Sequence, residues 1–138
     1  MKKMMRLYYL LWVDAIINSS KYKANKHNDI LNVFYLITVS NTLNLYTICL
    51  WLKLFNIVNY NLNFDFFPDN LIFNTAAFLI QFALPFILIN FLLILRNKRY
   101  EKIIIKYPKN KGGNFAFFYI ISSALISFVS VILYGLLS

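Results

Sequence analysis

The chain has 138 residues, of which 60% are apolar and 19% aromatic, and its formal net charge is +9. A soluble domain of this length is nearer about 45–50% apolar, because a small globule cannot hide more apolar surface from water. The composition therefore excludes an ordinary soluble domain and indicates a protein that lipid solvates.

The positive charges lie beside long apolar runs. They form one block before Asp29 and another at residues 96–111. This placement is typical of segments that adjoin a membrane and attract anionic headgroups. A nucleic-acid platform is the weaker interpretation, because no DNA- or RNA-binding motif is recognisable. Cys49 is the only cysteine, so neither an internal disulfide nor a cysteine metal cluster can form.

The first predicted element is an interfacial amphipathic helix at residues 4–20. Arg6 and Asp14 interrupt its apolar run, which is therefore shorter than the roughly 20 residues that a spanning helix needs. A secretory signal is rejected because Asp14 lies inside the run and no small-x-small cleavage site follows. We expect Asp14 either to face the cytoplasm or to meet Lys102 or Arg99. The apolar face of the helical wheel comprises Met4, Met5, Tyr8, Leu11, Trp12, Ala15 and Ile16.

Three longer runs predict transmembrane helices, because each is apolar over about 20 residues or more. The second of them is predicted to continue into the cytoplasm as a basic helix. The expected fold class is an all-α membrane protein, with three transmembrane helices, the interfacial helix and this helical extension in one membrane domain. The spans are expected at residues 30–54, 71–95 and 115–137, the extension at 96–107, and the domain at 1–138.

The lysines and arginines predict an orientation. With the N-terminus in the cytoplasm and the C-terminus in the periplasm, thirteen of the fourteen lie inside, and Lys53 is the exception. Trp51, Tyr60 and Tyr134 then fit the outer aromatic belt. Lys53 either snorkels to the outer headgroups or forms an ion pair with Asp65 or Asp69.

The predicted spans carry no aspartate, glutamate, histidine, lysine or arginine at depth, where a membrane enzyme or ion-coupled transporter would place one. This pattern excludes paired intramembrane aspartates, a histidine metal cluster and a carboxylate proton relay within one chain. We therefore expect no enzymatic activity, no catalytic residue, no cofactor and no metal. The sequence identifies no small-molecule substrate.

Neutral polar side chains form a stripe on each predicted span. Such side chains prefer partners across a helix interface, so we expect helix packing or partner contact, with a ligand or ion path as the alternative. Pro85 removes one backbone donor and predicts a kink near Gln81. Asn90 lies opposite the Gln81 stripe. The stripes comprise Thr38, Asn41, Thr42 and Asn44; then Asn74, Gln81 and Pro85; and finally Ser123, Ser127 and Ser130.

Several short segments resemble stretches in short multi-pass membrane proteins of Bacteroidota. The resemblance carries no functional residue and implies only a bacterial inner-membrane location. The segments are Leu7-Tyr8-Tyr9, residues 12–16, Phe82-Ala83-Leu84-Pro85, residues 99–104 and Tyr134-Gly135.

The leading functional hypothesis is a non-catalytic small integral membrane subunit that packs into a larger inner-membrane complex and stabilises or anchors it. Its expected partners are that complex and anionic lipid headgroups on the cytoplasmic side, with no nucleic acid. The first alternative is a homo-oligomeric transporter or channel lined by Asn41, Asn44, Asn74 and Gln81. The second is a membrane protein of the bacteriocin-immunity type.

Overall fold

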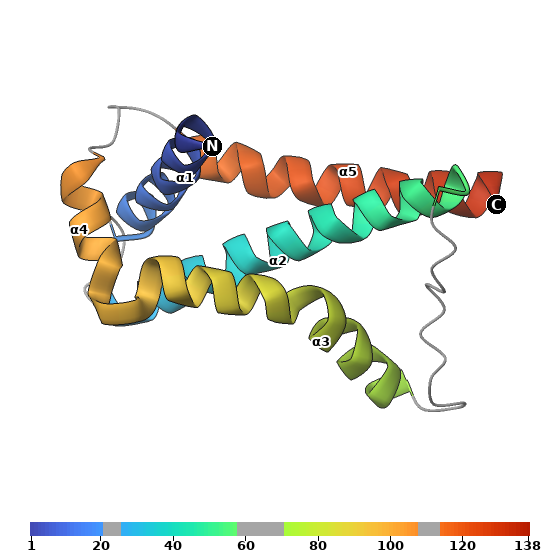
Figure 1. Ribbon diagram of the computed structural model, residues 1–138, viewed down its shortest axis with the longest axis horizontal. Helices are drawn as coiled ribbons and strands as arrows, with labels where there is room; N and C mark the ends of the chain where they lie inside the picture. Colours follow the sequence, from blue (N-terminus) through green and yellow to red (C-terminus); the bar gives the residue numbers. More distant parts are fainter. Residues whose placement is uncertain (21–25, 58–70, 108–113) are drawn as a thin grey trace. The chain divides into compact units, whose positions relative to one another are not determined.

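A computed structural model describes residues 1–20, 26–57, 71–107 and 114–138 of the chain. All regular structure in these ranges is helical (Figure 1). The elements are α1 (Lys2–Ser20), α2 (Lys26–Leu54), α3 (Leu71–Asn90), the π-helix η1 (Phe91–Leu95), the 3₁₀-helix η2 (Arg96–Lys98), α4 (Arg99–Lys106) and α5 (Phe115–Leu137).

Three helical segments are long and apolar enough to cross a membrane, which confirms the predicted number of spans and the all-helical fold. They are Ile30–Leu54, Ile80–Lys106 and Phe115–Leu137. The shortest has 23 residues, or about 35 Å of helix against a hydrocarbon core of about 30 Å. Helices suit these sequences because a helix satisfies its own backbone hydrogen bonds, which lipid cannot do.

The described residues divide into two compact units. The first, which we call the basic unit, comprises Met1–Ile37 and Ile89–Ile121. Its core contains Trp12, Ile37 and Ile94, each with 0% of its surface exposed. Helix α4 packs beside α1 in this unit, where Tyr9 stacks on Tyr107 at 5.7 Å between ring centroids (Figure 1).

Helix α1 forms as predicted, but its amphipathic character is not confirmed. Residues 11–16 are all buried, so protein encloses this middle stretch of the helix on every side. Asp14, expected on a polar face, is only 5% exposed. Asp14 is buried because α1 lies among other helices of the basic unit. In contrast, residues 1–7 are all exposed.

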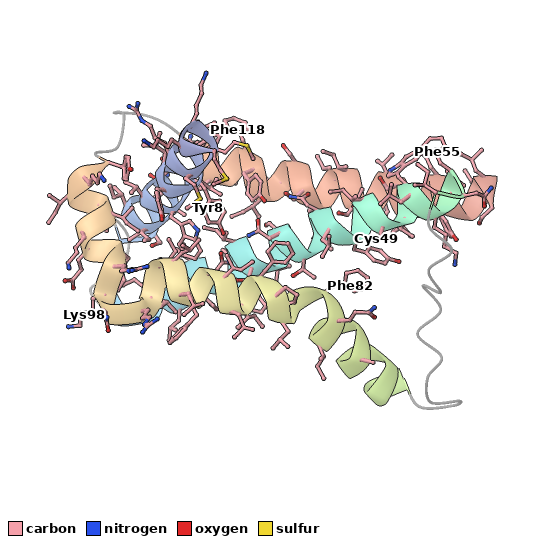
Figure 2. All side chains as sticks on the ribbon, viewed as in Figure 1. Tyr8, Cys49, Phe55, Phe82, Lys98 and Phe118 are labelled. Carbon is pink, nitrogen blue, oxygen red and sulfur yellow. The ribbon has the colours of Figure 1, made fainter. Side chains whose placement is uncertain are left out.

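Helix α3 does not continue straight into α4. The π-helix η1 and the 3₁₀-helix η2 intervene, and Asn97 and Lys98 adopt left-handed conformations with φ of 55° and 53°. The predicted basic helix at residues 96–107 therefore begins at Arg99. One Arg99 guanidinium nitrogen donates to the Leu92 carbonyl oxygen at 3.2 Å, which holds the bend closed. Figure 2 shows Lys98 at this bend, with its side chain directed outward.

The second unit comprises Thr38–Leu88 and Ser122–Ser138. Leu50 of α2 and Phe82 of α3 are buried at its apolar centre, with Tyr46 and Cys49 packed against them. Figure 2 labels Cys49 on α2 and Phe82 on α3. Helix α3 runs through Pro85 without ending, and its axis changes direction along its length (Figure 1), as the proline predicts.

Candidate functional site

A line of hydrogen bonds joins α2 to α5 in the second unit, and we call it the polar seam. At one end, the Asn44 amide nitrogen donates to the Ser123 hydroxyl at 3.0 Å. At the other end, the Trp51 indole nitrogen donates to the Ser130 hydroxyl at 3.0 Å. Both pairs run in the same chain direction, so the two helices are parallel here.

Ser127 makes the central contact of the polar seam. Its hydroxyl donates to the Leu43 carbonyl oxygen at 3.2 Å and lies 2.8 Å from the Thr47 hydroxyl. Because the Ser127 proton is directed at the carbonyl, the Thr47 hydroxyl is the donor in the second bond. One serine thus joins the backbone and a side chain of the neighbouring helix.

The spacing of the seam follows from helix geometry. Its α2 members are separated by three and four residues, and its α5 members by four and three, which places each set on one face. Hydrogen bonds between spanning helices contribute about 0.6 kcal/mol each on average, so three side-chain pairs contribute about 2 kcal/mol. The seam members are Asn44, Thr47, Trp51, Ser123, Ser127 and Ser130.

Thr47 and Trp51 were not among the predicted packing residues. Trp51 was assigned to the outer aromatic belt, yet its indole nitrogen bonds within the chain. A sequence signal for both residues exists, because they lie three and seven positions after Asn44 and therefore share its helical face. The predicted stripe on α2 ended at Asn44, and the structure places Thr47 and Trp51 beside Asn44 in the seam.

The rest of the α2 stripe is enclosed by protein. Thr38, Asn41 and Thr42 are all buried. The Thr42 hydroxyl donates to the Thr38 carbonyl oxygen at 2.8 Å, one turn earlier in the same helix. Such a bond satisfies a threonine hydroxyl in an apolar environment without a partner helix.

The described residues of the stripe expected on the second span are less buried than most of the α2 stripe. Gln81 is half-buried and Pro85 is exposed, while the side chain of Asn74 lies outside the described part of the structure. Asn90, on the opposite side, is 0% exposed, and its amide oxygen accepts a hydrogen bond from the Tyr8 phenol. Sequence analysis missed Asn90 because its partner is 82 residues away along the chain.

Asp14 lies at the start of α5 in the basic unit. One of its carboxylate oxygens accepts a hydrogen bond from the backbone N–H of Ala116 at 2.9 Å. Ala116 is the second residue of α5, and N–H groups in the first turn have no partner within the helix. A carboxylate there also meets the positive end of the helix dipole, which contributes up to about 2 kcal/mol in a partly buried setting.

Trp12 is the largest side chain at the centre of the basic unit. Its ring meets Tyr8 edge-on at 6.4 Å and Phe34 at 6.2 Å between centroids. Its indole N–H is buried and has no hydrogen-bond partner among the described residues. Burying this donor costs about 1–3 kcal/mol, which its aromatic packing offsets in part.

The predicted ion pair of Lys53 stays a prediction. Lys53 is half-buried in the last turn of α2. Asp65 and Asp69, its expected partners, lie outside the described residues. Within the described ranges, no group of three or more histidine, cysteine, aspartate or glutamate side chains is arranged to hold a metal ion.

Comparison of the chain with protein-family models, with curated proteins and with solved structures finds no match. The resemblance to Bacteroidota proteins therefore stays a prediction. Three helices of membrane-spanning length and composition place the chain in the class of integral membrane proteins.

Proposed function

We propose that this chain is a non-catalytic integral membrane subunit that packs into a larger inner-membrane complex and stabilises or anchors it. The supporting observation is Gln81 on α3. The side chain that carries this amide is half-buried. It belongs to a spanning segment that otherwise exposes apolar side chains such as Ile80 and Leu84.

An amide within a spanning helix favours a hydrogen-bonding partner over lipid. Along α5 this demand is met inside the chain, because Ser123, Ser127 and Ser130 all bond to α2. Those serines therefore need no partner protein. On this reasoning α3 is the helix that meets a partner, with Gln81 as its polar contact.

The test is recovery of the native complex. The tagged chain is extracted from its own membrane in mild detergent, and mass spectrometry identifies what accompanies it. We expect Gln81→Leu to reduce recovery of the accompanying chains severalfold. Ile80→Leu is the matched control because it changes an exposed neighbour at constant volume. Equal recovery with both variants, or recovery of this chain alone, contradicts the proposal.

Two other hypotheses are separated by the same preparation. A symmetric oligomer of this chain that conducts solutes in liposomes would favour a channel. Against that reading, Asn44 bonds to Ser123 and Asn41 is buried, so two of the four expected lining residues face the chain's own helices. A bacteriocin-immunity role would be indicated by genes for a matching toxin beside this gene.

The proposed orientation puts the N-terminus in the cytoplasm and the C-terminus in the periplasm. Thirteen of the fourteen lysines and arginines fall within the sequence ranges of the basic unit, which the positive-inside rule assigns to the cytoplasmic side, where anionic headgroups attract it. The exposed first turns of α1, with Met4 and Leu7, then rest in the interface. Compartment-specific reporters fused at residues 1 and 138 should report opposite sides, and a shared side would refute three crossings.

A further inference from the structure

The basic unit contains a pocket between α1, α2 and α5, with a volume of about 160 Å³. Val33 and Ile37 of α2 form one wall and Ile120 of α5 the other. Ala15 of α1 and Ala116 of α5 also line it, and their small side chains leave the space open.

The pocket lies where two spanning segments begin. Val33 and Ile37 are three and seven residues after Ile30, the first residue of one span, and Ile120 is five residues after Phe115, the first of another. At about 1.5 Å per residue, these walls lie about 5–10 Å inside the ends of the spans. That is the depth at which the acyl chains of one leaflet begin.

The lining has the polarity that a lipid requires. The walls are aliphatic, and an apolar space of about 150 Å³ is large enough for a benzene-sized hydrocarbon. Leu36 and Phe117 at the rim are 45% and 58% exposed, so the pocket opens to the surroundings of the helices. Asn18 and Ser19, at the end of α1, complete the lining, and the Ser19 hydroxyl donates to the Ile16 carbonyl oxygen at 2.9 Å within that helix.

The charge of the surrounding unit indicates which lipid fits. The sequence ranges of the basic unit hold thirteen lysines and arginines against three acidic residues, a net charge of +10. The ranges of the second unit hold one lysine against two aspartates, a net charge of −1. An anionic headgroup is therefore attracted to the unit that contains the pocket.

We propose that this pocket holds a benzene-sized segment of one acyl chain of an anionic phospholipid, drawn from the leaflet on the side of the basic unit. The segment of the tail lies against the aliphatic walls, and the headgroup lies outside the pocket, beyond the ends of the spans. The proposal rests on the membrane location but not on a partner complex. The purified chain alone therefore tests it.

The experiment is native mass spectrometry of the chain in mild detergent, with equal amounts of phosphatidylglycerol and phosphatidylcholine added. We expect one phosphatidylglycerol per chain, preferred by about fivefold or more, since each cation near a headgroup contributes about 1 kcal/mol. Glycerol 3-phosphate, which has the charge without the tail, should not displace it. Equal retention of the two lipids, or displacement by glycerol 3-phosphate, overturns the proposal.

Variants separate the pocket from the general surface. Leu36→Trp places an indole over the opening, and we expect it to abolish the preference for phosphatidylglycerol. Tyr35→Trp is the matched control, because Tyr35 is an exposed neighbour that does not line the pocket. Ala15→Leu fills the pocket from within and should act like Leu36→Trp. An unchanged preference in the helical, monodisperse Leu36→Trp protein overturns the assignment to this pocket.

Discussion

Replacement of Lys98 by glycine should stabilise the protein. Asn97 and Lys98 adopt left-handed conformations at the bend between η1 and α4, with φ of 55° and 53°. A residue with a side chain costs about 1–2 kcal/mol in this conformation, whereas glycine adopts it freely. Glycine also gains about 0.5–1 kcal/mol of entropy in the unfolded chain, so we expect a net stabilisation of about 0.5–1 kcal/mol.

The assay is thermal unfolding in mild detergent, followed by circular dichroism. A change of 1 kcal/mol shifts the melting temperature by about 2–4 °C in a chain of this size, so Lys98→Gly should raise it by about 1–4 °C. Lys98→Ala removes the charge but keeps the left-handed cost, and it should leave the melting temperature unchanged.

Lys102→Gly is the control of opposite sign. Lys102 is exposed within α4, where glycine costs about 1 kcal/mol, so this variant should melt at a lower temperature. If Lys98→Gly lowers the melting temperature as Lys102→Gly does, the left-handed conformation of Lys98 does not cost the protein stability.

Three further substitutions probe the buried polar contacts. Ser127→Ala removes both hydrogen bonds at the centre of the polar seam and should destabilise the chain by about 1 kcal/mol, whereas Ser122→Ala, at an exposed position, should have no effect in the same melting assay. Tyr8→Phe deprives a fully buried amide of its phenol donor and should cost about 1–3 kcal/mol in urea unfolding; an equal loss in Tyr35→Phe, at an exposed position, would contradict this. Asp14→Asn keeps the shape but removes the charge at the start of α5 and should cost up to about 2 kcal/mol, with hydrogen exchange accelerating first in that helical turn.

Much of the fold could be predicted because it depends on local sequence. The sequence contains three uncharged runs that have the length of a membrane span, and lipid leaves them no alternative to a helix. A single residue, Pro85, likewise predicts that the axis of α3 changes direction. The bend after Leu95 was not predicted, since no glycine or proline marks Asn97 and Lys98 as left-handed.

The candidate site was predictable only in part. Ser123, Ser127 and Ser130 stand out because they repeat on one helical face, but the sequence does not say which helix they meet. A hydroxyl can make its hydrogen bond equally well to a partner protein or to a second helix of the same chain. Gln81 and Asn90 show the difficulty. Both amides lie in apolar sequence on α3, yet Gln81 is half-buried and Asn90 is fully buried.

The sequence by itself determined that this protein is helical, that three of its segments suit the hydrocarbon core, and that its charge concentrates in one set of segments. These properties follow from the solvent preference of each run. Only the tertiary structure decided that Asp14 caps α5, that Tyr8 meets Asn90 and that the seam serines bond to α2. Each of these contacts joins residues about 80 or more positions apart, and their pairing depends on how whole helices pack, which no local pattern encodes.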